Sequence, residues 1–194
     1  MSEVQTVRGR ACDSCTLCCK VLAIPEVPTP RDAWCRNCAV GKGCKVYDQR
    51  PEPCRTFFCG YLIWDAVPDH WFPAKAKIVV VSELGFRVNF YVDASQPGRW
   101  REKPWYDDIK ALTIRAIADG RQVLVTAGSR VFAIFPDRDV DLGSVAPDEA
   151  VVTGQRPDGT WGAAKVPASD PRLVQLSGGI SLSGLIPLAF VFDA

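Results

Sequence analysis

Histidine is almost absent from this sequence. The 194 residues contain one, His70, in the segment PDHWFP. Imidazole is a common zinc ligand and the usual proton carrier near neutral pH. A histidine-rich metal site is therefore excluded, and a mixed histidine and cysteine site is limited to this residue. The chain also lacks a phosphate-binding glycine loop, a dinucleotide fingerprint and a Gly-x-Ser-x-Gly motif, so none of these enzyme classes is indicated.

The sequence also lacks a charge excess and a long apolar run. There are 23 Lys and Arg against 22 Asp and Glu, so the overall charge gives no reason to expect nucleic acid or an anionic membrane as a partner. The opening MSEVQTVRGRACDS has no apolar stretch, which argues against a secretory signal. The most apolar run, LIPLAFVF at 185–192, is too short to span a membrane and is expected to form a buried or edge strand. Together these features predict a cytoplasmic protein without membrane association.

Cysteine, in contrast, is abundant in one segment. All nine cysteines lie between Cys12 and Cys59, and residues 60–194 contain none. Thiols in a reducing compartment rarely form disulfides, and an odd number does not suit a fully paired framework. The segment also has little hydrophobic periodicity, so burial of apolar side chains alone would not hold it folded. Thiols at this density indicate bound metal.

The cysteines form three groups, with repeated two-residue gaps. Such gaps let one turn present two sulfur atoms to a single ion, which is why they recur in zinc and iron–sulfur sites. We therefore predict that the segment binds metal through its thiols. The predicted ligands are Cys12, Cys15, Cys18 and Cys19 in the first group, Cys35, Cys38 and Cys44 in the second, and Cys54 and Cys59 in the third.

The adjacent pair Cys18 and Cys19 makes a sharper prediction. In an extended chain, neighbouring side chains point to opposite faces. Two adjacent thiolates are then awkward ligands for one tetrahedral ion, but they suit two neighbouring sites or a cluster with a bridging sulfur. We expect Cys18 and Cys19 to serve different metal positions.

The segments CDSCTLCC and GCKVYDQRPEPCRTFFC resemble a known pattern. They are similar to the bacterial cysteine-cluster (Cys-x-x-Cys-x-x-Cys-Cys) family, described as zinc- or iron-chelating domain proteins, over residues 12–60. Cys35 falls on the family's middle cysteine, whereas Cys38 is an addition, and Phe58 lengthens the last spacing. The resemblance implies metal binding, leaves the metal and any activity open, and says nothing of residues 66–194. The family positions are matched by Cys12, Cys15, Cys18, Cys19, Cys44, Tyr47, Arg50, Pro51, Cys54, Arg55, Phe57 and Cys59.

Two arginines near Cys54 have two readings. Arg50 and Arg55 can donate hydrogen bonds to the thiolates and so support the ligands. Alternatively, they form ordinary surface or carboxylate contacts.

The identity of the metal remains open at the level of sequence. Two sites of four cysteines each would use eight of the nine thiols, which favours zinc. The run Cys-x-x-Cys-x-x-Cys also matches the start of a bacterial ferredoxin motif, so an iron–sulfur cluster with redox or modifying-enzyme activity is the alternative. A third hypothesis is a metal-free thiol redox sensor. The sequence names no substrate, and the partner is an unidentified protein or small molecule.

The fold class is predicted as α+β, with a boundary near residue 66. Residues 1–65 are expected to form a small metal-stabilised module packed on a second domain, 66–194, that has a mainly antiparallel sheet and one principal helix. The runs AKIVVV and FRVNFYV predict a hairpin, as do QVLVT and VFAIF around AGSR, and AVVTG and WGAAKV around a Pro-Asp-Gly turn. KPWYDDIKALTIRAIADG predicts the helix, with Pro104 at its first position, Gly120 at its C-terminal end, and Trp105, Ile109, Leu112 and Ala116 facing the core.

Overall fold

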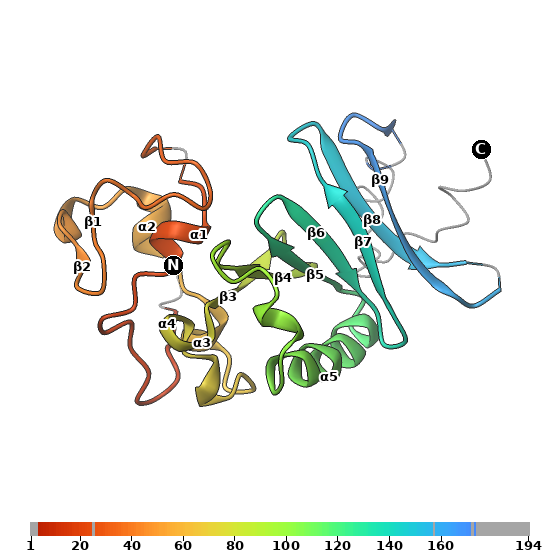
Figure 1. The fold of residues 1–194 in the computed structure, drawn as a ribbon, viewed down its shortest axis with the longest axis horizontal. Coiled ribbons are helices and arrows are strands. Elements are labelled where there is room, and N and C mark those ends of the chain that lie inside the picture. The colour runs from red at the N-terminus through yellow and green to blue at the C-terminus, as the bar shows by residue number, and fades with distance from the viewer. Residues whose placement is uncertain (1–3, 25, 157, 172, 174–194) are drawn as a thin grey trace. The chain divides into compact units, whose positions relative to one another are not determined.

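The computed structural model describes residues 4–24, 26–156, 158–171 and 173 (Figure 1). The chain divides into two compact units. The first unit comprises Met1–Val81 and Phe90–Trp105, and the second comprises Ser82–Asn89 and Tyr106–Ala194. The predicted boundary near residue 66 falls inside the first unit and stays a prediction.

Short elements dominate the first unit, which contains every cysteine. None of its α-helices exceeds five residues among the described part of the chain, because turns and prolines interrupt the segment repeatedly. Its elements before the main sheet are α1 (Cys18–Val21), β1 (Cys38–Ala39), β2 (Gly43–Cys44), η1 (Tyr47–Gln49), α2 (Glu52–Thr56), α3 (Gly60–Ile63), η2 (Asp69–Trp71) and α4 (Pro73–Ala76), and η3 (Arg99–Arg101) follows the sheet's second strand.

A five-stranded sheet follows, in the order β3-β4-β5-β6-β7. Its strands are β3 (Ile78–Glu83), β4 (Arg87–Val92), β5 (Gln122–Ala127), β6 (Arg130–Ile134) and β7 (Asp139–Ser144). The predicted hairpin at residues 122–134 is confirmed, because Ala127 pairs with Arg130 across a two-residue turn. A separate antiparallel pair, β8 (Glu149–Gln155) and β9 (Trp161–Pro167), confirms the third predicted hairpin.

The sheet is mixed rather than purely antiparallel. β6 pairs antiparallel with both β5 and β7. β4 and β5 run parallel, because their contacts advance in the same direction along both strands. The Gln122 amide donates to the Phe86 carbonyl at 2.8 Å, and Thr126 Oγ1 donates to Asn89 Oδ1 at 3.1 Å. Parallel neighbours need a long crossover, and the helix α5 (Trp105–Ala118) provides it. The α+β class with one principal helix is confirmed at this level.

The helix α5 ends as its sequence predicts and begins one residue later than the predicted first position, Pro104. It starts at Trp105, directly after Pro104, and Gly120 follows its end with a φ of 71°. The Gly120 and Arg121 amides bond back to the Ile117 and Ala116 carbonyls, which is the Schellman arrangement that favours glycine at this position.

The predicted core face of α5 is partly right. Ile109 and Ala116 are buried, whereas Trp105 and Leu112 are half-buried and Thr113 takes a buried position instead. The Thr113 hydroxyl is satisfied because it donates to the Ile109 carbonyl, one turn back, at 2.8 Å.

Each unit has a core of its own. The second unit packs Leu124, Phe135 and Val151 together, with Ile117 of α5 against them. In the first unit, Leu17 and Val21 of the cysteine-rich segment pack with Leu62 and Val79. No described helix is long and apolar enough to cross a membrane. The run at 185–192 lies outside the described residues.

Candidate metal centre

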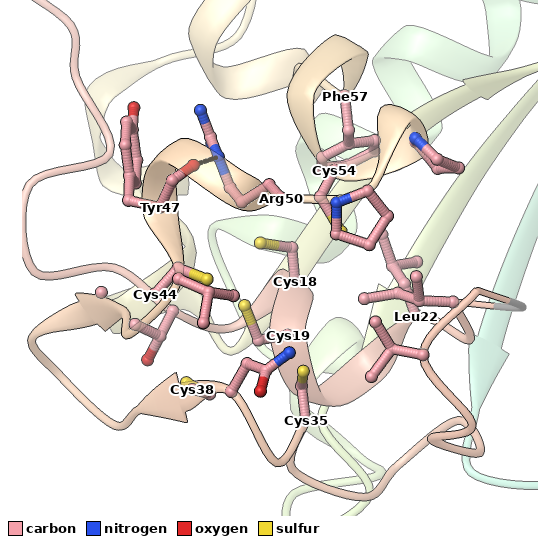
Figure 2. A pocket seen from close by; sticks show the side chains of 18 of the residues that line it. Cys18, Cys19, Leu22, Cys35, Cys38, Cys44, Tyr47, Arg50, Cys54 and Phe57 are labelled. Atoms are coloured by element: carbon pink, nitrogen blue, oxygen red, sulfur yellow. Dashed lines mark hydrogen bonds between the residues drawn. The ribbon is translucent and has the colours of Figure 1, made fainter.

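All nine cysteines are described, and none of them forms a disulfide. Eight of them line a single cavity of about 230 Å³ in the first unit. Figure 2 shows the sulfur atoms of Cys18, Cys19 and Cys44 turned toward a common space. The cysteines that line this larger cavity are Cys12, Cys15, Cys18, Cys19, Cys35, Cys38, Cys44 and Cys54.

A smaller cavity of about 90 Å³ shares four of its five cysteines with the larger one. Five cysteines line it, Cys12, Cys15, Cys18, Cys54 and Cys59, and we call them the five-thiol set. The other four, Cys19, Cys35, Cys38 and Cys44, line only the larger cavity, and we call them the four-thiol set. The adjacent cysteines Cys18 and Cys19 thus belong to different sets.

Local backbone structure draws the four-thiol set together. The Cys38 amide donates to the Cys35 carbonyl at 2.9 Å and closes a turn over the Cys-x-x-Cys gap. Cys38 lies opposite Cys44 in the pairing of β1 with β2, so the two side chains share one face. The Cys35 amide donates to the Cys19 carbonyl at 2.9 Å, which joins α1 to this hairpin. Neighbouring members of the set are therefore connected through the backbone.

The five-thiol set is held by a second turn and by the core. The Cys15 amide donates to the Cys12 carbonyl at 2.7 Å, which repeats the Cys-x-x-Cys turn. Cys59 is buried beside Leu17 and Val21, and Cys15 packs against the same cluster. Cys54 lies in α2 and lines both cavities.

The backbone at the adjacent pair differs from the expected extended chain. Cys18–Val21 form the helix α1, so the expectation of opposite faces is wrong in its geometry. Successive side chains on an α-helix diverge by about 100°. Cys18 and Cys19 nonetheless both line the larger cavity, and their side chains hydrogen-bond to one another. That they serve different metal positions stays a prediction.

Cys19 differs electrostatically from the thiols around it. Its sulfur accepts a hydrogen bond from Cys18 and another from Cys38, and together with the charge of Arg50 these lower the pKa of Cys19 to about 6. Donating that bond raises the pKa of Cys18 well above the usual value. Burial raises the pKa of Cys38 and of Cys59 to about 11.

Of the two arginines, one faces the thiols. Arg50 lines both cavities, its Nε donates to the Tyr47 carbonyl at 2.8 Å, and its guanidinium lies 3.6 Å from the centroid of the Tyr47 ring. Arg55 instead forms an exposed ion pair with Glu52, which agrees with the carboxylate reading.

Two supporting residues escaped the sequence analysis. Thr16 is buried, hydrogen-bonds to Cys38 and accepts the Gly41 amide at 3.1 Å. The sequence could have pointed to Thr16, because it lies between two predicted ligands in CTLCC. Lys20 pairs with Asp93 at 2.6 Å, a contact across 73 residues that no local pattern reveals.

Thiol donors suit soft metal ions, although the sulfur atoms do not converge on one position. Among the described residues no three His, Cys, Asp or Glu side chains already have the spacing of ligands to one ion. Thiolates are the preferred donors for zinc and for iron–sulfur clusters. Binding would therefore require rotation of side chains inward, which the space in the two cavities permits.

The pKa of Cys19 predicts a distinct reactivity in the metal-free protein. At pH 7.5 Cys19 should be more than about 90 % thiolate, whereas a thiol of pKa 11 should be under about 1 %. Its alkylation rate should fall as pH drops through about 6, because the sulfur then takes up a proton. Alkylation followed by peptide mass spectrometry from pH 5 to 9 measures this profile for each cysteine. A midpoint above pH 8 at Cys19 would contradict the assignment.

Comparison with protein-family models, with curated proteins and with solved structures found no match.

Proposed function

We propose that residues 12–59 bind two zinc ions at two neighbouring thiolate sites. The observation that carries this proposal is the gathering of all nine thiols around two adjoining cavities, as sets of four and five. Each set supplies enough sulfur for a tetrahedral zinc ion. Cys18 would serve one ion and Cys19 the other.

The protonation of the buried thiols links zinc binding to pH. Burial raises the pKa of five thiols, so the metal-free cavities favour the neutral form there: Cys12, Cys15, Cys38, Cys54 and Cys59. Zinc displaces those protons, and its affinity should therefore fall steeply as the pH is lowered. The positive charge of Arg50, which lines both cavities, would offset part of the negative charge of two zinc–thiolate centres.

An iron–sulfur cluster is the second candidate, and the size of the larger cavity favours it. About 230 Å³ is far more than a single bare ion occupies, and apolar Leu22, Ile24, Val27 and Phe57 line it beside the thiols. Such a lining would limit access of water to a cluster and so tune its potential. This candidate carries the redox or modifying activity that the sequence left open.

Elemental analysis and an absorbance spectrum of anaerobically purified full-length protein test the proposal. We expect about two zinc ions per chain and no visible absorbance, because zinc has a filled d shell. Visible absorbance with stoichiometric iron would replace zinc by the second candidate. Freshly purified protein without either metal would contradict metal binding and favour the redox-sensor hypothesis.

A matched pair of variants separates a specific site from loose thiol binding. Cys44→Ser removes a member of the four-thiol set, which has no thiol to spare, and should lower the zinc content to about one ion. Cys54→Ser removes one of five and should leave about two ions. Equal losses in both variants would contradict the division into two sets.

A further inference from the structure

The five-thiol set has one thiol more than the four-thiol set, and this difference affects how each set would hold a zinc ion. A tetrahedral zinc ion takes four sulfur ligands. The four-thiol set is then complete with every member bound, whereas the five-thiol set always holds one sulfur in reserve. A reserve ligand beside a bound ion can replace any ligand that leaves. The five-thiol set thus has a spare ligand of its own, whereas the four-thiol set has none among its members.

The five-thiol set is also the more exposed of the two sets. Cys12, in the five-thiol set, is the one cysteine of the nine whose side chain is exposed. It begins the turn to Cys15, beside an open, charged hollow of about 500 Å³ that Arg8, Asp13 and Lys75 help to line. Among the nine cysteines, Cys12 is therefore the one most open to an incoming molecule.

The four-thiol set is closed off by comparison. Cys35 and Cys38 are 7 % and 8 % exposed and pack with Val27, with Ile24 and Cys19 against them. No member of this set is exposed. An ion held there would lose its ligands only after local opening of this small core.

We propose that the five-thiol site carries its zinc ion as cargo, which passes to a thiol-bearing acceptor through replacement of Cys12, while the four-thiol site retains a structural ion. This inference rests on the proposed zinc binding. In the exchange step the acceptor thiol releases its proton to solvent and its sulfur bonds to zinc. The bond from zinc to Cys12 breaks, and the Cys12 sulfur takes up a proton. No electron is transferred, and the charge is balanced.

Release kinetics of the full-length, two-zinc protein test this proposal. A chromogenic chelator reports free zinc after addition of dithiothreitol in one arm and of a reduced Cys-x-x-Cys peptide in the other. We expect two phases of equal amplitude, with rates that differ by about 100-fold or more. The faster of the two acceptors identifies whether a small dithiol or a peptide pair is the better source of thiols. A single phase with both acceptors would overturn the proposal.

Two serine variants of the five-thiol set locate the exchange. Cys12→Ser leaves four thiols, so it should keep about two ions but slow the fast phase by about tenfold or more. Cys54→Ser also removes the spare thiol but keeps the exposed Cys12, so it should retain both ions and a fast phase that is slowed less than in Cys12→Ser.

The possible failures are distinguishable. An unchanged fast phase in Cys12→Ser, or loss of an ion from it, overturns the exchange role of Cys12 but leaves two-site zinc binding intact. Wild-type protein that contains no zinc overturns the proposed function itself, and this inference with it.

Discussion

Removal of the proposed zinc ions is expected to unfold residues 12–59 and to leave the second unit folded. Among the described residues before 60, only Leu17, Val21 and Val27 are buried apolar side chains other than cysteine. So small an apolar core offers little to hold the segment folded. In small zinc modules the binding of the metal supplies the folding free energy that such a core lacks.

Hydrogen exchange with and without a chelator measures this effect by region. Peptides from 12–59 should lose protection, whereas β5, β6 and β8 should keep it, because the core around Leu124 and Phe135 contains no cysteine. Equal protection of 12–59 in both conditions would show that metal does not hold the segment together. Cys44→Ser serves as a partial control, since it should lose protection mainly around β1 and β2.

Asp93→Ala is expected to destabilise the first unit by about 3 kcal/mol, because it leaves a mostly buried lysine without its partner. Lys20 Nζ lies 2.6 Å from Asp93 Oδ1, and the two side chains are 16 % and 7 % exposed. Burial opposes ionisation of Asp93, but hydrogen bonds from Lys20 and Ser95 outweigh it and lower its pKa below the ordinary value. The pair ties α1, which carries Cys18 and Cys19, to the end of β4.

Denaturant unfolding of the variants measures this cost. Asp137→Ala is the matched control, because its ion pair with Arg138 is exposed and should contribute less than about 1 kcal/mol. Adding Lys20→Met to Asp93→Ala should recover part of the loss, since the unpaired cation is removed. Additive effects of the two substitutions would show that the pair contributes no coupling energy.

The sequence predicted α5 and the hairpins β5–β6 and β8–β9 of the second unit, because their signals are local, but it did not predict the strand β7. A two-residue turn joins β5 to β6, a longer turn that includes Asp158 and Gly159 joins β8 to β9, and Gly120 ends α5. The parallel pairing of β4 with β5 was not predicted. It depends on where α5 returns the chain, and no pattern inside either strand encodes that.

For the candidate site, spacing identified the thiols but not their grouping. The gaps in the sequence suggested three groups in chain order, whereas each of the two cavities is lined by thiols from distant segments. Cys59 joins Cys15 through the core around Leu17, and Cys19 joins Cys35 through a backbone hydrogen bond. Both contacts are set by tertiary packing, so a linear reading could not give them.

The two thiol sets are nested along the chain. Cys12, Cys15 and Cys18 precede every member of the four-thiol set, and Cys54 and Cys59 follow every member. An ion bound to the four-thiol set would link Cys19 to Cys44. The shortest path along the chain from Cys18 to Cys54 would then fall from 36 residues to 11. By the logarithmic dependence of loop-closure entropy on length, this shortening is worth about 1 kcal/mol, or about fivefold in affinity. The ion in the four-thiol set would therefore keep residues 12–18 close to residues 54–59 when the five-thiol site is empty. The five-thiol site could then bind its next ion without first bringing these two segments together.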